Sequence, residues 1–164
     1  MTRNLYTTLF YPTWMHIQKG CSVIARQVLS LDKENSPKTI VAIGPDGFVP
    51  GVIISNILDI PLFGINYRSQ VAAHPFIDGI ERKEYQVING MLTEDLENNP
   101  SILLVDAIVN SGHTMDEMFE RYESLDHKVY GASLYIREGS VFFPTMYWNK
   151  ILKEDPDVEF PWKI

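Results

Sequence analysis

A short polar loop between two apolar segments is the part of this chain best suited to binding a phosphate group. The loop, residues 110–114, reads Asn-Ser-Gly-His-Thr. It follows an apolar run from Ile102 to Val105 that ends at the carboxylate of Asp106, and it precedes a segment, 115–122, with apolar residues at helical spacing. Hydroxyl groups and backbone N–H groups at the start of a helix point toward an anion, and the helix dipole favours its charge. Residues 101–116 therefore predict a phosphate site.

The elements that must position this loop are a buried strand and a helix. The run from Ile102 to Val105 is continuous and apolar, as in a strand that is buried on both faces. Asp116 and Glu117 fall in the first turn of the predicted helix, where acidic side chains are favoured. The stretch has neither the Gly-Lys of a P-loop nor the three glycines of a dinucleotide-binding loop. It indicates a phosphate site of another kind.

The rest of the chain alternates between helical and strand-like patterns. A strand followed by a loop, a helix and another strand predicts a parallel sheet with helices packed on it. Residues 68–84 show no strong period, and the tail from residue 141 onward is rich in aromatic residues. The predicted helices are 13–29 and 49–58, the turn between sheet and second helix is 44–47, and the further strands are 39–43, 61–67, 85–88 and 128–136.

Composition narrows the class of protein. The chain has 164 residues, which suits a single domain (1–164), and its 45% hydrophobic and 21% charged residues are ordinary for a globular protein. The net charge of -7 argues against general nucleic-acid binding. A single cysteine, Cys21, excludes an internal disulfide and a multi-cysteine zinc site. No apolar stretch approaches the roughly 20 residues of a membrane span. We expect a cytoplasmic protein with no nucleic-acid or membrane partner.

Two stretches resemble the motifs of one enzyme family. Residues 102–114 consist of four apolar residues, an acid, three apolar residues and a residue-Ser/Thr-Gly-x-Thr loop. This pattern resembles the 5-phosphoribosyl 1-pyrophosphate (PRPP) motif of type I phosphoribosyltransferases. Residues 40–51 resemble the pyrophosphate loop of that family, and Pro161-Trp162 resembles the ending of xanthine-guanine and related purine enzymes. The resemblance covers roughly 12–70 and 100–137. It implies an α/β fold with a central, mostly parallel sheet flanked by helices and a small C-terminal hood region.

The resemblance also implies an activity and its partners. Enzymes of this family move the phosphoribosyl group of PRPP to a nucleobase and release pyrophosphate, with Mg²⁺ as the cofactor. The expected ligands are PRPP together with a nucleobase, or a nucleoside monophosphate. The resemblance to the purine enzymes indicates a purine as the base. We further expect a homo-oligomer, either a dimer or a tetramer. Residues 68–84 occupy the place of the flexible loop that closes over the reaction in this family.

The resemblance assigns roles to individual residues. Asp106 is expected to face the ribose hydroxyls and the Mg²⁺ ion, and it forms the catalytic pair with Asn110. Arg137 stands where purine enzymes carry a lysine that reads the exocyclic oxygen of the base, and Tyr147 or Trp148 is expected to stack on the base. The 5′-phosphate is assigned to Asn110, Ser111, Gly112, His113 and Thr114, and the pyrophosphate to Asp46, Gly47 and Arg68.

Three positions depart from the family pattern. Ala107 replaces the second of two adjacent acids, Asn110 replaces an aspartate of the 6-oxopurine enzymes, and Asp46 stands where an arginine or lysine is common. A rival hypothesis follows, in which the protein binds PRPP or a nucleotide for regulation and has lost turnover. Arg68 and Arg137 are alternatively solvated surface charges, and the tail aromatics are alternatively core or dimer contacts.

Overall fold

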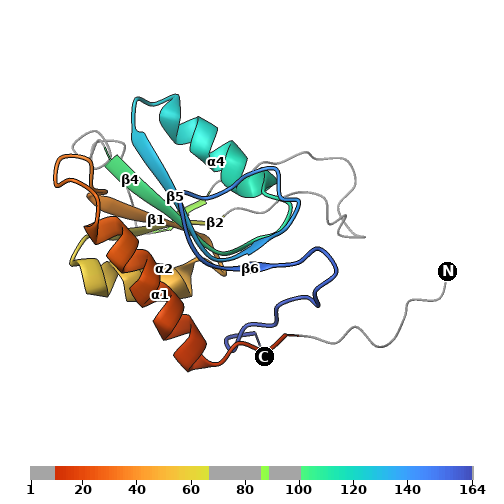
Figure 1. The fold of residues 1–164 in the computed structure, drawn as a ribbon. Helices are drawn as coiled ribbons and strands as arrows, with labels where there is room; N and C mark the ends of the chain where they lie inside the picture. Colours follow the sequence, from red (N-terminus) through yellow and green to blue (C-terminus); the bar gives the residue numbers. More distant parts are fainter. Residues whose placement is uncertain (1–9, 67–85, 89–100, 164) are drawn as a thin grey trace.

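A six-stranded sheet with helices on both faces forms the centre of the computed structural model, which describes residues 10–66, 86–88 and 101–163 (Figure 1). The strand order is β3-β2-β1-β4-β5-β6. Five of these strands run parallel, and β3 is antiparallel to β2. The strands are β1 Thr39–Gly44, β2 Leu62–Asn66, β3 Gln86–Ile88, β4 Ser101–Val109, β5 Lys128–Arg137 and β6 Met146–Ile151; the helices are α1 Trp14–Leu29, α2 Phe48–Leu58 and α4 His113–Glu123.

The two faces of the sheet are covered by different helices. On β4, Leu103 and Val105 belong to the core cluster that includes α1 and α2, whereas Ile102 and Leu104 belong to the cluster that includes α4. This alternation is the period of a strand buried on both sides. Figure 1 shows α1 and α2 together on one side of the sheet and α4 on the other. The α/β fold predicted from the sequence is confirmed.

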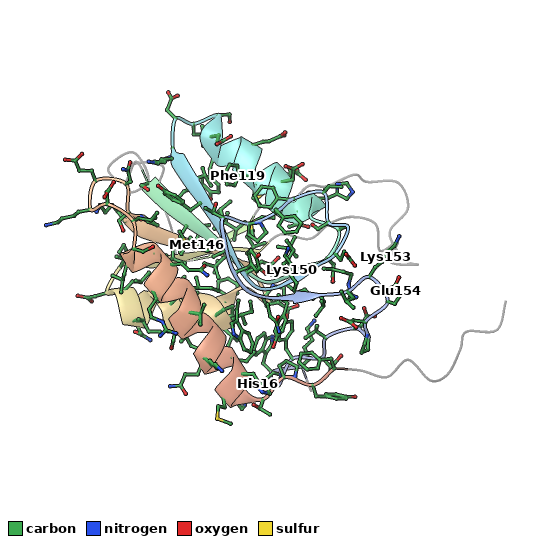
Figure 2. All side chains as sticks on the ribbon, viewed as in Figure 1. His16, Phe119, Met146, Lys150, Lys153 and Glu154 are labelled. Carbon is green, nitrogen blue, oxygen red and sulfur yellow. The ribbon has the colours of Figure 1, made fainter. Side chains whose placement is uncertain are left out.

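The first helix shows how local sequence sets an element. Thr13 caps α1: its hydroxyl accepts a hydrogen bond from the His16 N–H, and the Thr13 N–H donates to the His16 Nδ1. Ile17, Cys21 and Ile24 then lie on one buried face of the helix. Figure 2 labels His16 on α1 and Phe119 on α4, the helices that cover opposite faces of the sheet.

Two strands differ from the prediction. β4 continues past Asp106 to Val109, because Asp106 and Ile108 stay in register with Ser133 and Tyr135 of β5. β6 was not predicted at all. Only the two ends of its sequence, Met-Tyr-Trp-Asn-Lys-Ile, are buried, so it lacks the alternation that marks a strand.

Some predicted features lie outside the residues that the structure describes. These are Arg68 and the whole of the predicted closing loop 68–84, since description stops at Asn66 and resumes only at β3, Gln86–Ile88. Among the helices that are described, none combines the length and apolar character needed to cross a membrane.

Candidate functional site

A pocket of about 280 Å³ opens where β1 and β4 end. The carboxyl ends of parallel strands are where α/β folds bind ligands. The pocket is formed by the turn after β1 on one side and by the end of β4 with the start of α4 on the other. Its lining consists of residues 43–46, Asp106, residues 108–112, Thr114 and Met115.

The pocket brings together most of the residues that the sequence singled out for chemistry. Two of them are next to lining residues in the chain but are not part of the lining: Gly47 is buried in the turn, and His113 is the exposed first residue of α4. The predicted residues that line the pocket itself are Asp46, Asp106, Asn110, Ser111, Gly112 and Thr114.

The loop 110–114 is held open toward the pocket from behind. Gly112 has φ 91°, and a Cβ there would lie 2.4 Å from the Ser140 Oγ and 2.6 Å from the Phe142 backbone nitrogen. The Val141 N–H donates to the Ser111 carbonyl at 2.9 Å. Within the described residues, no side-chain hydrogen bond caps the N-terminus of α4. The N–H groups of its first turn therefore face the pocket side, where the positive end of the helix dipole also lies. This geometry suits a phosphate group.

Gly47 brings the turn after β1 close to β4. A Cβ on Gly47 would lie 2.3 Å from the Val105 carbonyl oxygen and 2.4 Å from the Ile43 carbonyl oxygen. Only a residue without a side chain permits this approach, which places Asp46 and Asp106 in one pocket.

Replacing Gly47 with alanine is expected to lower the free energy of unfolding by about 2–4 kcal/mol, because the added methyl must displace backbone atoms. The matched control is Gly139→Ala. Nothing lies within 4 Å of a Cβ at Gly139, and only its φ of 85° opposes a side chain, which costs about 1 kcal/mol. Urea denaturation measures both variants, and equal losses would contradict the close approach at Gly47.

Asp106 is a half-buried carboxylate with an unusual pKa. Its Oδ1 accepts a hydrogen bond from the Ala107 N–H at 2.7 Å. Burial raises the pKa of Asp106 from 3.8 to about 7; the negative charge of Asp46 adds to this rise, while the Ala107 hydrogen bond and the charge of Lys163 oppose it. Asp106 is therefore a group whose charge depends on what binds beside it.

The carboxylate of Asp46 is held by Trp162 and Lys163. Its Oδ1 accepts from the Trp162 indole N–H at 3.1 Å, and its Oδ2 pairs with the Lys163 ammonium group at 2.8 Å. The sequence motifs assign no role to Trp162 or Lys163, although Pro161-Trp162 resembles the ending of the purine enzymes. Their contact with a turn more than one hundred residues earlier depends on tertiary structure, and no local signal marks it.

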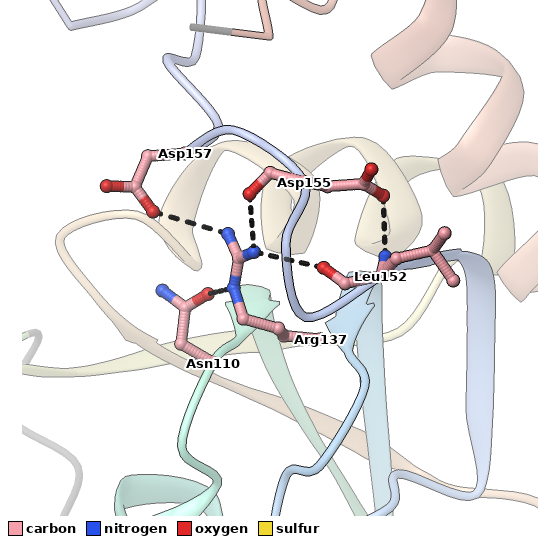
Figure 3. A network of polar contacts seen from close by, with 5 residues as sticks. All are labelled: Asn110, Arg137, Leu152, Asp155 and Asp157. Atoms are coloured by element: carbon pink, nitrogen blue, oxygen red, sulfur yellow. Dashed lines mark hydrogen bonds and ion pairs between the residues drawn. The ribbon is translucent and has the colours of Figure 1, made fainter. Parts of the chain in front are cut away.

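Arg137 lies at the rim of the pocket in a fixed network (Figure 3). Its Nε donates to the Asn110 Oδ1 at 3.0 Å, and its Nη2 pairs with the Asp157 Oδ1 at 3.3 Å. Its Nη1 donates to the carbonyl oxygens of Leu152 and Asp155 at 3.3 and 3.0 Å. The side chain is 15% exposed, so it is no solvated surface charge. Of its five N–H donors, one on Nη2 has no partner among these contacts.

The two tail aromatics proposed for base stacking lie elsewhere. Trp148 packs toward α1, with its ring 5.4 Å from that of Tyr135 and closely against Gly20. Tyr147 packs toward the α4 side, 6.4 Å from Phe143. Neither ring lines the pocket. Trp162, which contacts Asp46, lies nearer to the pocket lining and stacks on Phe160 at 4.5 Å.

The donor set fits Mg²⁺. Asp46, on the turn after β1, and Asp106, on β4, offer carboxylate oxygens to one pocket. Within the described ranges, no group of three or more His, Cys, Asp or Glu residues could hold a metal by itself. Mg²⁺ commonly binds through one or two carboxylates and takes its other ligands from water and substrate phosphates. Ala107, at the second acidic position of the family motif, is fully buried, so an acid there would be buried in the core.

Comparison with known proteins agrees with this geometry. A family model described as the phosphoribosyl transferase domain matches residues 11–164. No curated protein matches the chain. Solved structures do match the chain. Their sequence identities to it are below 25%, so the likeness shows the fold.

Three of the matching structures are as follows. A purine phosphoribosyltransferase from Pyrococcus horikoshii has 24% identity and a TM-score of 0.71, with 94% of this chain and 93% of that one covered. A xanthine-guanine-hypoxanthine phosphoribosyltransferase from Helicobacter pylori has 19% identity and a TM-score of 0.73, with 94% of each chain covered. A hypothetical protein from Neisseria gonorrhoeae with bound ppGpp has 18% identity and a TM-score of 0.68, with 97% and 91% covered.

Proposed function

The chain belongs to the phosphoribosyltransferase family of enzymes, and from this premise we propose that it transfers the phosphoribosyl group of PRPP to a 6-oxopurine base, with Mg²⁺ as cofactor and pyrophosphate as product. One observation carries the proposal. A single pocket joins the loop 110–114, the carboxylate of Asp106 and the turn that ends at Gly47. These are the groups that a phosphate, a ribose and a pyrophosphate need, in the order in which PRPP carries them.

Each part of the pocket has a task in this reaction. The N–H groups at the start of α4 and the hydroxyls of Ser111 and Thr114 bind the 5′-phosphate. Asp106 accepts hydrogen bonds from the ribose hydroxyls. The bond to pyrophosphate breaks with positive charge developing on the ribose, and the negative charge of Asp106 stabilises it. Mg²⁺, held by Asp106 and Asp46, would neutralise the departing pyrophosphate.

The rim of the pocket supports a 6-oxopurine as the acceptor. Because Arg137 can only donate, the Asn110 oxygen faces it, and the Asn110 NH₂ group is left free to donate. Arg137 adds its one remaining N–H. Two neighbouring donors match the N7 and O6 acceptors on one edge of guanine, whereas adenine presents a donor in place of O6. Hypoxanthine and xanthine share the O6 acceptor.

A panel of bases tests this proposal. With PRPP and Mg²⁺, we expect hypoxanthine, guanine or xanthine to be converted to its nucleotide with a kcat/KM about 100-fold or more above that of adenine, because the amino group of adenine would face a donor of the site in place of an acceptor. Chromatography of the nucleotide products gives the ratio. Preference for adenine or for a pyrimidine would contradict the assigned base edge.

A second candidate is a family member that binds nucleotides without turnover. Two features favour it: Asn110 cannot accept a proton from the base, and Ala107 offers no second acid. The likeness to a protein with bound ppGpp is compatible with such a role. Calorimetry together with the product assay separates the two candidates, since this one predicts binding of GMP or ppGpp with no product from any base.

A further inference from the structure

The side chains that line the pocket carry negative charge, although the expected ligand is an anion. Asp46 and Asp106 put two carboxylates into it, and within the part of the chain that is described no lysine or arginine lines it. The ligand of the proposed function carries a phosphate and a pyrophosphate. The start of α4 offsets part of that charge on the 5′-phosphate side. Mg²⁺ at Asp46 and Asp106 would offset the charge of these two carboxylates but not that of the pyrophosphate as well, so the turn at residues 44–46 still calls for a positive side chain.

Two cations stand just outside the lining, and they differ in freedom. Arg137 is bound to four acceptors and is 15% exposed, so it is fixed at the base side. Lys163 has one ion pair, to Asp46, and its side chain is 42% exposed. Its ammonium group has three donors, of which Asp46 uses one. The ammonium group also lies 5.8 Å from the centre of the Phe160 ring, a contact that leaves its remaining donors open. Lys163 is therefore the less constrained of the two cations and can take a second anionic partner.

The main chain of Lys163 is held beside the pyrophosphate turn. Trp162 donates to the Asp46 Oδ1 at 3.1 Å and stacks on Phe160, which is 1% exposed. The Lys163 N–H donates to the Phe160 carbonyl at 2.9 Å. The backbone is thus anchored in the core, while four methylene groups let the ammonium group reach beyond Asp46.

We propose that Lys163 is the pyrophosphate-binding cation of this site. In the free protein it neutralises Asp46, and with substrate bound it turns to the pyrophosphate oxygens while Trp162 keeps Asp46 in place. The family pattern has a positive side chain at position 46. In this protein Lys163 supplies that charge in its place. The inference rests on the proposed function, because it takes pyrophosphate to be the anion at this turn.

Calorimetry with two probes tests the proposal. Inorganic pyrophosphate with Mg²⁺ reports on the turn at residues 44–47, and GMP reports on the loop 110–114. We expect Lys163→Met to weaken pyrophosphate binding about 10-fold and to reduce its salt dependence, with GMP affinity unchanged within about twofold. Lys163→Arg should retain most of the affinity. Lys19→Met is the matched control, since Lys19 is exposed on α1, and it should change neither affinity.

The outcomes separate this inference from the function beneath it. Unchanged pyrophosphate affinity in Lys163→Met, while the wild type binds both probes, overturns the inference alone. An equal loss for pyrophosphate and GMP also overturns it, because the residue would then serve only to hold the fold. A wild type that binds neither probe overturns the proposed function and this inference together.

Discussion

Replacing Asp106 with asparagine is expected to abolish phosphoribosyl transfer and to stabilise the ligand-free protein at pH 8. The loss of transfer should be at least about 100- to 1,000-fold in kcat, the range found when a preorganised electrostatic group is removed from an active site. Asparagine keeps an oxygen that can accept the hydrogen bond from the Ala107 N–H. The backbone at the end of β4 therefore has no reason to move.

The gain in stability follows from the direction of the pKa shift. The pKa of Asp106 is raised from 3.8 to about 7 in the folded protein, chiefly by burial. Between these two values the folded state holds a proton that the unfolded state has lost, so its stability falls as the pH rises through this window. At pH 8 the wild type carries the whole cost, and the neutral asparagine carries none. We expect a gain of about 1–2 kcal/mol at pH 8, smaller at pH 5.

Urea denaturation at pH 5 and pH 8 measures this difference. Asp59→Asn is the control: Asp59 is exposed at the end of α2 with a φ of 54°, which asparagine tolerates. Its effect on the free energy of unfolding should be small. A loss of stability in Asp106→Asn at pH 8 would show that the carboxylate is structural. A stability gain with transfer intact would remove Asp106 from the reaction.

Replacing Asn110 with aspartate is expected to raise turnover with a 6-oxopurine by about 10- to 100-fold. The amide of Asn110 can donate to the base but cannot take its proton, whereas a carboxylate can. General-base assistance is typically worth roughly 100- to 10,000-fold. We expect the lower part of that range, because the new carboxylate would lie 3.0 Å from the Arg137 Nε, whose charge lowers its basicity.

Steady-state kinetics at saturating PRPP measures the effect of Asn110→Asp. Asn56→Asp makes the same chemical change on the exposed face of α2 and should leave turnover unchanged. If Asn110→Asp and the wild type both lack turnover while they still bind PRPP, the nucleotide-binding candidate is favoured. Ala107→Asp is no alternative way to restore an acid, because Ala107 is 0% exposed and its side chain packs in the core.

The parts of the site that lie on one continuous stretch could be predicted from the sequence. The strand, polar loop and helix start at 101–116 are local, so their residue types reveal them, and the turn at 44–47 is marked in the same way by its two glycines. The parallel order of β1 and β4 then places both stretches at one edge of the sheet. Family, fold and most of the pocket lining followed from these two patterns.

The parts that could not be predicted arise where distant segments meet. Asp46 contacts Trp162 and Lys163, and Arg137 contacts Asp155 and Asp157, only after the tail has folded back along the sheet. No spacing in the sequence encodes such contacts. The packing of Tyr147 and Trp148 on opposite faces of the sheet has a related origin: successive residues of a strand point to opposite faces, and no alternation in the sequence marks β6 as a strand.

Pyrophosphate release from PRPP tests the central claim most directly. The wild type and Asp106→Asn are each mixed with PRPP, Mg²⁺ and either hypoxanthine, guanine or xanthine, and pyrophosphate is followed with a coupled enzyme assay. The pocket described here predicts release by the wild type that depends on both the base and Mg²⁺, and a loss of at least about 100-fold in the variant. Equal release by the two proteins, or none from the wild type with any of these bases, would contradict it.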